Sequence, residues 1–272
     1  MMKELTLKDI QRQGLLILKD VHDFCQAHGI RYSMAYGTAI GAVRHQGFIP
    51  WDDDVDLFMP RPDYELFCRL YKQRPYELVA PQDGESYITF ARVCDMQHTV
   101  SKMATPWCKH ETGVWIDIFP VDGADDDKRD FDARYEKAHS LWLRTYRERG
   151  ARQKLIGDFG IRTKLKLLVK KIIYANGLLL ERHLREFNTL IQQKDFKSSK
   201  YCCQMACCDN GSDEYFPSSV FNSIISVPFE NYKFCLVEDF DTVLRTEYGD
   251  YMQLPPEDKR VPKLSETRFY RK

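Results

Sequence analysis

Four aspartates that lead directly into an apolar strand constrain the fold of this chain more than any other feature. The run Asp54-Val55-Asp56-Leu57-Phe58-Met59 alternates in the manner of a β-strand and stops at Pro60. Side chains two positions apart on a strand point to one face, so Asp54 and Asp56 should present their carboxylates together. Neighbouring carboxylates near the interior repel each other unless a cation lies between them. Because hard ions such as Mg²⁺ or Mn²⁺ favour these oxygen ligands, the pattern predicts a metal site; a solvated acidic turn is the alternative.

A phosphate-binding turn is predicted just before these acids. The strand-like run 30–36 ends at Gly37-Thr38, and residues 39–45 are typical of a short helix. Glycine lets a phosphate approach the backbone, and the free amides of a helix N-terminus attract anions. A Gly-Thr pair alone marks only a turn. Followed by a short helix and an Asp-x-Asp strand, it has the arrangement of the nucleotidyltransferase fold.

That fold needs a third carboxylate from a neighbouring strand. Asp117 lies amid apolar residues in the strand-like run 113–121, where an unpaired charge would be costly. We therefore predict Asp54, Asp56 and Asp117 as the catalytic residues. A buried aspartate satisfied by backbone amides is the alternative for Asp117. Asp122 is less suitable because it lies at a turn that contains glycine.

The rest of the chain predicts an α/β (α+β) fold, with a nucleotidyltransferase-like mixed sheet flanked by helices. We expect one catalytic domain over residues 1–272, with a helical insertion at about 125–195. Helical periodicity covers residues 5–28, 61–71, 125–149, 162–193 and 237–248. Further strand-like runs cover residues 87–93, 200–208 and 224–235.

Composition narrows the class of protein and its compartment. The 40 basic and 40 acidic residues argue against a general nucleic-acid binder, which would show a basic excess. The N-terminus lacks the features of a signal peptide, and no apolar run reaches the roughly 20 residues that cross a bilayer. Nine scattered cysteines favour a reducing compartment. We expect a cytoplasmic protein.

Residues 37–56 resemble the signature of the LicD family, bacterial phosphorylcholine transferases related to the fukutin group of phospho-sugar transferases. The resemblance continues through Trp115-Ile116-Asp117-Ile118-Phe119-Pro120 and resumes at Phe229-Glu230 and at residues 248–256. It therefore spans nearly the whole chain. This sequence departs from the family pattern at Asn231, in the tail after residue 260 and in the cysteines at 202, 203, 207 and 208.

The resemblance implies transfer of phosphorylcholine from CDP-choline to a hydroxyl of a glycan or lipid-linked glycan, such as a precursor of teichoic acid, lipopolysaccharide or capsule. Asp54, Asp56 and Asp117 would hold Mg²⁺ (or Mn²⁺), with Asp52 as a further ligand and Asp117 as the proton acceptor. Donor-binding residues would be Gly37, Thr38, Arg44, His45 and Trp51. Arg44 and His45 could equally be solvent-facing residues of a helix. Another CDP-linked donor, carrying ethanolamine, ribitol or glycerol, is the first alternative, and a nucleotide-sugar glycosyltransferase is the second.

Choline is a quaternary ammonium ion, which aromatic faces bind. The candidates for such a cage are Tyr36, Trp51, Trp107, Trp115 and Tyr251, although most aromatic residues belong to the core.

Two weaker patterns remain open. The cysteines at 202, 203, 207 and 208 lack the usual spacing of a zinc site, so a buried strand face is expected. The segment 162–173 carries five basic residues and no acidic one. It predicts either a helix resting on an anionic membrane face, at the inner membrane, or an ordinary surface helix with its apolar side inward.

Overall fold

The computed structural model describes residues 2–72, 75–103, 107–150, 161–173, 178–209, 211–262 and 267–272. Its helices are α1 Leu7–His28, α2 Tyr36–His45, α3 Arg61–Leu70, α4 Lys128–Gly150, α5 Ile161–Ile173, α6 Leu178–Ile191 and α7 Phe240–Tyr248. Its strands are β1 Ser33–Met34, β2 Asp56–Pro60, β3 Tyr76–Val79, β4 Ala91–Asp95, β5 Thr99–Met103, β6 Trp115–Gly123, β7 Tyr201–Cys203, β8 Tyr215–Pro217, β9 Ile224–Phe229, β10 Tyr232–Val237 and β11 Thr267–Arg271.

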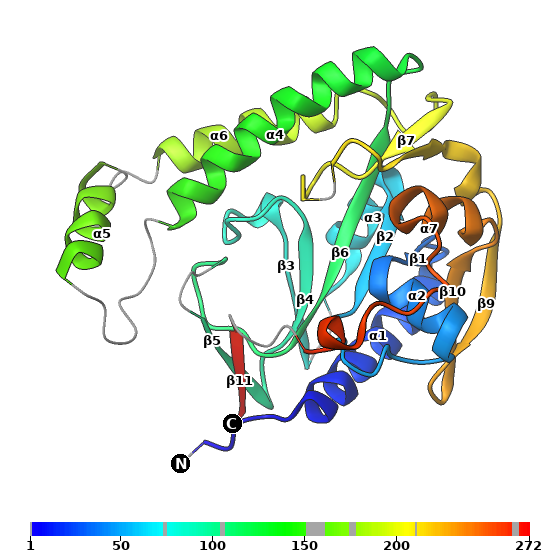
Figure 1. Cartoon of the computed structure of the whole chain (residues 1–272), viewed down its shortest axis with the longest axis horizontal. Coiled ribbons are helices and arrows are strands. Elements are labelled where there is room, and N and C mark those ends of the chain that lie inside the picture. Colours follow the sequence, from blue (N-terminus) through cyan, green and yellow to red (C-terminus); the bar gives the residue numbers. More distant parts are fainter. Residues whose placement is uncertain are drawn as a thin grey trace.

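A mixed sheet built around β6 forms the centre of the molecule (Figure 1). Its main path runs β1-β2-β6-β4-β3, and β7 and β8 continue from the far end of β6. The pair β2–β6 is parallel, whereas β1–β2, β4–β6, β3–β4 and β6–β7 are antiparallel. Two separate ribbons, β9–β10 and β5–β11, complete the strands. The predicted mixed α/β fold is confirmed.

The two faces of the sheet bury two apolar clusters, as the alternation of side chains along a strand requires. Leu57 and Ile118 point to the face covered by α1, while Phe58 and Phe119 point to the other. On that second face, α4 and α6 pack side by side across one end of the sheet (Figure 1). Asp56 and Asp117 alternate with the residues of the first face, so both belong to the second.

Helix α1 shows why local sequence sets an element here. The Thr6 hydroxyl oxygen accepts a hydrogen bond from the Asp9 amide, and the Thr6 amide donates one to the Asp9 carboxylate, which forms a reciprocal capping box. Gly29 ends the helix in the left-handed conformation, at φ 64°. The apolar positions between them, including Ile17 and Val21, are fully buried.

The helical insertion is tied to the sheet by Arg134 of α4. Its Nε donates to the Asp125 carboxylate at 2.7 Å, and its Nη atoms donate to the carbonyls of Gly123 and Ile191 at 3.1 and 3.3 Å. One buried guanidinium therefore joins the end of β6 to both α4 and α6.

Several sequence-based boundaries were wrong. The periodic segment 162–193 is two helices, α5 and α6, and residues 174–177 between them lie outside the described residues. The strand expected over 87–93 begins at Ala91 instead. The run 224–235 is a hairpin of two strands, β9 and β10. The strands β3, β5, β8 and β11 were not predicted. Of these, β5 and β11 pair with each other from distant parts of the chain.

Candidate active site

Asp56 and Asp117 lie directly opposite each other in the parallel pair β2–β6. The Asp117 amide donates to the Val55 carbonyl at 2.8 Å, which fixes this register at the start of β2. Asp56 is the first residue of β2 and is only 9% exposed. Asp54, expected on the same strand, instead lies in the loop before it and is exposed. Strand pairing, rather than alternation along one strand, therefore brings two of the three predicted carboxylates together.

These carboxylates line a cleft of about 840 Å³. Of the predicted site residues, the cleft is lined by Gly37, Arg44, Trp51, Asp52, Asp54, Asp56 and Asp117. Thr38 and His45 are not part of the lining. The second face of the sheet contributes Phe90 and Phe119. The C-terminal part of the chain contributes Tyr248, Asp250, Tyr251 and residues 253–256.

The acids in the cleft repel one another. Burial raises the pKa of Asp56 well above its usual value, and the charges of Asp54, Asp117 and Asp52 raise it further against the opposing charge of Arg92. Burial likewise raises the pKa of Asp117, with Arg92 again opposing. Bringing a cation to this cluster would relieve the repulsion.

The geometry of the acids fits a hard metal ion. One carboxylate oxygen from each of Asp52, Asp53 and Asp54 lies within 4.8 Å of the others. Asp52 and Asp54 share the cleft with Asp56 and Asp117. The donor set is all carboxylate oxygen, which is the chemistry that Mg²⁺ or Mn²⁺ prefers.

Arg92 is a site residue that the sequence did not reveal. It lies opposite Asp117 in the antiparallel pair β4–β6, and its Nε donates to Asp117 Oδ1 at 2.5 Å while Nη2 donates to Oδ2 at 3.3 Å. Its guanidinium packs over the rings of Trp107 and Trp115, at 4.4 and 4.5 Å from their centroids. These two tryptophans, both candidates for a choline cage, therefore hold an arginine and do not line the cleft. Tyr36, Trp51 and Tyr251 do.

The first turn of α2 contacts two of the aspartates, Asp52 and Asp56. A Cβ atom on Gly37 would lie 2.5 Å from Asp52 Oδ2, so only glycine lets this carboxylate approach the helix. Thr38 Oγ1 accepts a hydrogen bond from the Asp56 amide at 2.9 Å. The Thr38 hydroxyl thus anchors the start of β2. Because it still has a hydrogen to donate, its predicted contact with a phosphate stays a prediction.

Arg44 and His45 connect α2 to the C-terminal part of the chain. Arg44 Nη1 donates to the Tyr251 carbonyl at 2.6 Å, and Arg44 Nε donates to His45 Nε2 at 3.0 Å. Burial, together with the charge of Arg44, lowers the pKa of His45. Of these two residues, Arg44 lines the cleft and His45 does not, and their predicted contacts with the donor stay predictions.

The segments that resembled one family in the sequence converge on this site. Glu230 Oε1 accepts from the Phe48 amide at 3.1 Å, and a Cβ on Gly47 would lie 2.3 Å from that oxygen. The Glu230 amide in turn donates to the Gln46 carbonyl at 2.8 Å. The β9–β10 turn therefore holds the loop that precedes the aspartates.

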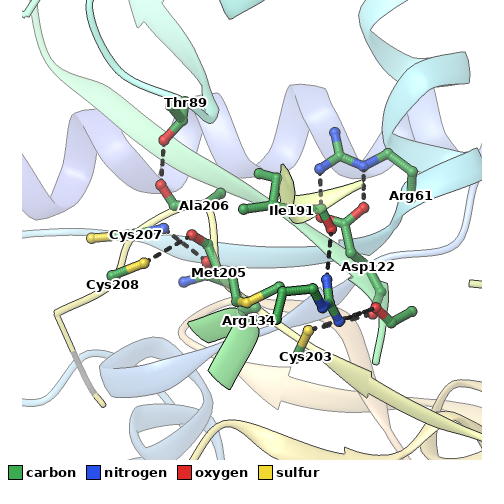
Figure 2. A network of polar contacts seen from close by, with 12 residues as sticks. Arg61, Thr89, Asp122, Arg134, Ile191, Cys203, Met205, Ala206, Cys207 and Cys208 are labelled. Carbon is green, nitrogen blue, oxygen red and sulfur yellow. Dashed lines mark hydrogen bonds and ion pairs between the residues drawn. The ribbon is translucent and has the colours of Figure 1, made fainter. Parts of the chain in front are cut away.

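Asp122, at the far end of β6, has a structural role. Arg61 Nε and Nη2 each donate to its carboxylate at 2.6 Å, and the side chain is 1% exposed (Figure 2). It does not line the cleft. The preference for Asp117 over Asp122 as a member of the acidic cluster agrees with this geometry.

Of the four clustered cysteines, Cys202 and Cys203 pair with that end of β6, whereas Cys207 lines the cleft. Their sulfur atoms make separate contacts. Cys203 Sγ lies 3.9 Å from the carbonyls of Asp122 and Gly123, and Cys208 Sγ donates to the Met205 carbonyl (Figure 2). Cys207 Sγ donates to the Asp209 carboxylate at 3.0 Å. In the same network the Thr89 hydroxyl donates to the Ala206 carbonyl. Only Cys202 and Cys203 lie on a strand, β7.

Comparison with known proteins identifies relatives of this chain. Residues 29–149, which run from the end of α1 to α4, match the family model described as LicD/FKTN/FKRP, nucleotidyltransferase domain. This part of the chain is therefore similar to the nucleotidyltransferase domain of the LicD family, as the resemblance of residues 37–56 predicted. The match includes Gly37, the four aspartates at 52–56, Arg92 and Asp117.

For one relative, the similarity to this chain extends beyond that domain. The chain is 29% identical over 272 residues to a Haemophilus influenzae protein named lipopolysaccharide cholinephosphotransferase LicD, with 96% of this chain and 97% of that protein covered. Shorter matches join it to uncharacterized proteins of Rickettsia typhi, at 38% identity over 65 residues, and Rickettsia prowazekii, at 45% over 47 residues. These cover 23% and 17% of this chain, and 21% and 18% of the respective relatives.

Proposed function

We propose that this chain is a metal-dependent transferase of the LicD family that moves phosphorylcholine from CDP-choline to a hydroxyl of a cell-surface glycan, with lipopolysaccharide as the first candidate. The observation that carries the proposal is the pairing of Asp56 with Asp117 in a cleft that also holds Asp52 and Asp54. The name of the Haemophilus influenzae relative supports both the cargo and the class of acceptor.

The acidic cluster is suited to bind the donor through a metal. Asp54, Asp56 and Asp52 would hold Mg²⁺ or Mn²⁺, which would neutralise charge on the pyrophosphate of the donor. Asp117, clamped by Arg92, would be a further ligand or the proton acceptor. Gly37 and the first turn of α2 lie beside Asp52, where their amides would face the phosphates.

The chemistry assigned to the chain's own residues is positioning and proton transfer. The acceptor oxygen forms a bond to the phosphorus that bears choline, and the bond from that phosphorus to the CMP oxygen breaks. The proton of the attacking hydroxyl passes to the Asp117 carboxylate. Arg92 holds that carboxylate in one orientation through two hydrogen bonds, and its charge adds to the electrostatic stabilisation of the phosphates.

The aromatic lining of the cleft suits a quaternary ammonium ion. Tyr36, Phe90, Phe119, Trp51 and Tyr248 all contribute to the walls. Aromatic faces attract such cations through the negative face of the ring. This lining favours choline over ribitol or glycerol as the cargo.

Release of CMP tests the proposal. Wild type would be incubated with CDP-choline, CDP-ethanolamine, CDP-ribitol or CDP-glycerol, with Mg²⁺ or with EDTA, and with a surface-glycan extract as acceptor. A parallel reaction with a UDP-sugar tests the alternative that the protein is a glycosyltransferase. We expect turnover of CDP-choline only with metal, and loss of it in Asp56→Asn. Asp130→Asn, an exposed aspartate on α4, is the matched control. Turnover of no CDP donor, or equal turnover in EDTA, would refute the mechanism.

A further inference from the structure

Helix α5 exposes an apolar stripe to solvent. The exposed fractions are 62% for Leu165, 54% for Leu168, 47% for Val169 and 69% for Ile172. Their spacing, at i, i+3, i+4 and i+7, places all four on one face of the helix. The sequence left open an ordinary surface helix with its apolar side inward, and these exposures contradict that alternative.

Basic residues flank this stripe, and acidic ones are missing from the sequence around it. Arg162, Lys166 and Lys171 are exposed. Successive residues turn by about 100° around a helix, so Lys166 and Lys171 lie on opposite sides of the apolar stripe. Between residues 159 and 180 the sequence contains five basic residues and no aspartate or glutamate. The helix is therefore cationic as well as amphipathic.

The position of α5 leaves this face accessible. Figure 1 shows α5 at one end of the long axis of the molecule, beyond the outer ends of α4 and α6 and on the opposite side from β9 and β10. Among the described residues, no helix combines the length and apolar character needed to cross a membrane. An attachment to lipid would therefore have to be made at the surface of the bilayer.

We propose that α5 binds in the plane of an anionic lipid surface, with its apolar stripe in the headgroup region and its lysines against the acidic headgroups. Charge complementarity selects this occupant, because an amphipathic helix with basic flanks and an exposed apolar face has the properties of interfacial helices. Long lysine side chains at the borders of the stripe reach out to the headgroups while their methylene groups stay in apolar contact. The inference goes beyond the proposed function and stands independently of the donor and acceptor.

Flotation with vesicles tests the inference on the full-length chain. Wild type should float with vesicles of phosphatidylglycerol mixed into phosphatidylcholine, and not with phosphatidylcholine alone. Lys166→Gln/Lys171→Gln and Leu168→Gln/Ile172→Gln should each weaken binding by about tenfold or more. Lys137→Gln/Lys233→Gln, which removes two exposed lysines from α4 and β10, is the matched control and should bind as wild type. Circular dichroism would establish that each variant is folded.

A fluorescent reporter places the helix itself at the lipid. Ile172→Trp should shift its emission to shorter wavelength with anionic vesicles and be quenched by brominated lipid tails. The inference is overturned if the wild-type protein does not bind anionic vesicles, or if both α5 double variants bind them as wild type does. It is also overturned if the control variant Lys137→Gln/Lys233→Gln loses as much binding as the α5 variants. Lipid binding without any response of the tryptophan at position 172 would assign the contact to another surface and also overturn it.

Discussion

Arg92 and Asp117 lie opposite each other on antiparallel strands and are joined by two hydrogen bonds, of 2.5 and 3.3 Å. The guanidinium is held from the sides by Trp107 and Trp115, so it cannot leave Asp117 without losing two aromatic contacts. Within the described cleft, Asp117 is thus a carboxylate whose orientation is set in advance of any ligand.

Replacing Arg92 should reduce the reaction more than it reduces folding. Arg92→Lys keeps the charge but loses the planar two-point contact and the stacking, so kcat for CMP release should fall about 100-fold with a smaller change in KM. A second variant, Trp107→Leu, should loosen the guanidinium and give an intermediate loss. Steady-state kinetics with a thermal unfolding control checks this. Wild-type kcat in Arg92→Lys would show that the orientation of Asp117 is irrelevant.

Asp56 should make the metal-free protein less stable as pH rises, and bound metal should offset that loss. Its pKa is raised in the folded protein, so the folded state binds more protons than the unfolded state above the usual value of 3.8. Without metal, stability should therefore fall as pH rises from that value through the raised pKa. Asp56→Asn should flatten this dependence and raise Tm in EDTA at pH 8. Mg²⁺ should raise the Tm of wild type and have less effect on Asp56→Asn, as measured by differential scanning fluorimetry.

Gly37 should be needed for the site and not for the fold. Alanine is favoured over glycine within a helix by about 1 kcal/mol, yet a Cβ at this position would displace the Asp52 carboxylate, which lies 2.5 Å away. Gly37→Ala should therefore lower activity by at least about tenfold at nearly unchanged Tm. Gly150→Ala has open space around its added methyl group and should be active. Full activity in Gly37→Ala would separate Asp52 from the metal site.

Asp122, in contrast to Gly37, should be needed for the stability of the fold and not for activity. Asp122→Asn leaves the buried Arg61 without its charged partner, which should cost about 3–5 kcal/mol of the free energy of unfolding. The fraction that remains folded should retain kcat. The double variant Arg61→Met/Asp122→Leu should recover much of the stability. Urea denaturation measures all three; a stable but inactive Asp122→Asn would place this aspartate in the chemistry.

Glu247 on α7 should make the chain less stable in mildly alkaline solution. Burial, and then the charge of Glu214, raises its pKa to about 9, and neither of its carboxylate oxygens has a hydrogen-bond partner among the residues that the structure describes. Stability should fall as pH rises from about 4.5 to about 9, because the folded state retains the proton longer. Glu247→Gln should therefore be more stable than wild type by roughly 2 kcal/mol near pH 8. Exposed Glu238→Gln is the control, and an identical pH profile in both would contradict the assignment.

The sequence predicted the parts of the site that depend on local pattern. Asp56 and Asp117 could be found because each acid interrupts an apolar strand, and Gly37 because a glycine precedes a short helix. Their direct juxtaposition depends on the β2–β6 register, which no local pattern encodes. The same limitation hid Arg92, whose role exists only through its cross-strand partner.

Contacts between distant parts of the chain explain the remaining differences between the predicted and the observed structure. The Thr38 hydroxyl accepts a hydrogen bond from the Asp56 amide, a role that no local pattern indicates, while its own hydrogen can still donate. Its contact with a phosphate stays a prediction. The ribbon β5–β11 joins residues 99–103 to 267–271, so its strands become recognisable only when both ends are seen together. The catalytic role of the acids and the identity of the metal remain predictions.

The hydrogen bond from Arg44 to the Tyr251 carbonyl spans 207 positions along the chain. Because Tyr248, Asp250, Tyr251 and residues 253–256 complete the wall of the cleft, the cleft cannot form until this late segment has emerged from the ribosome. Loop closure over such separations is slow compared with the folding of helix α1 or the β9–β10 ribbon. The C-terminal residues thus serve two purposes at once, because Tyr251 and Phe269 are buried in the main core while Tyr251 also lines the cleft. A chain that ended ahead of Tyr251 would lose part of its core, the strand that pairs with β5, and one wall of the cleft together.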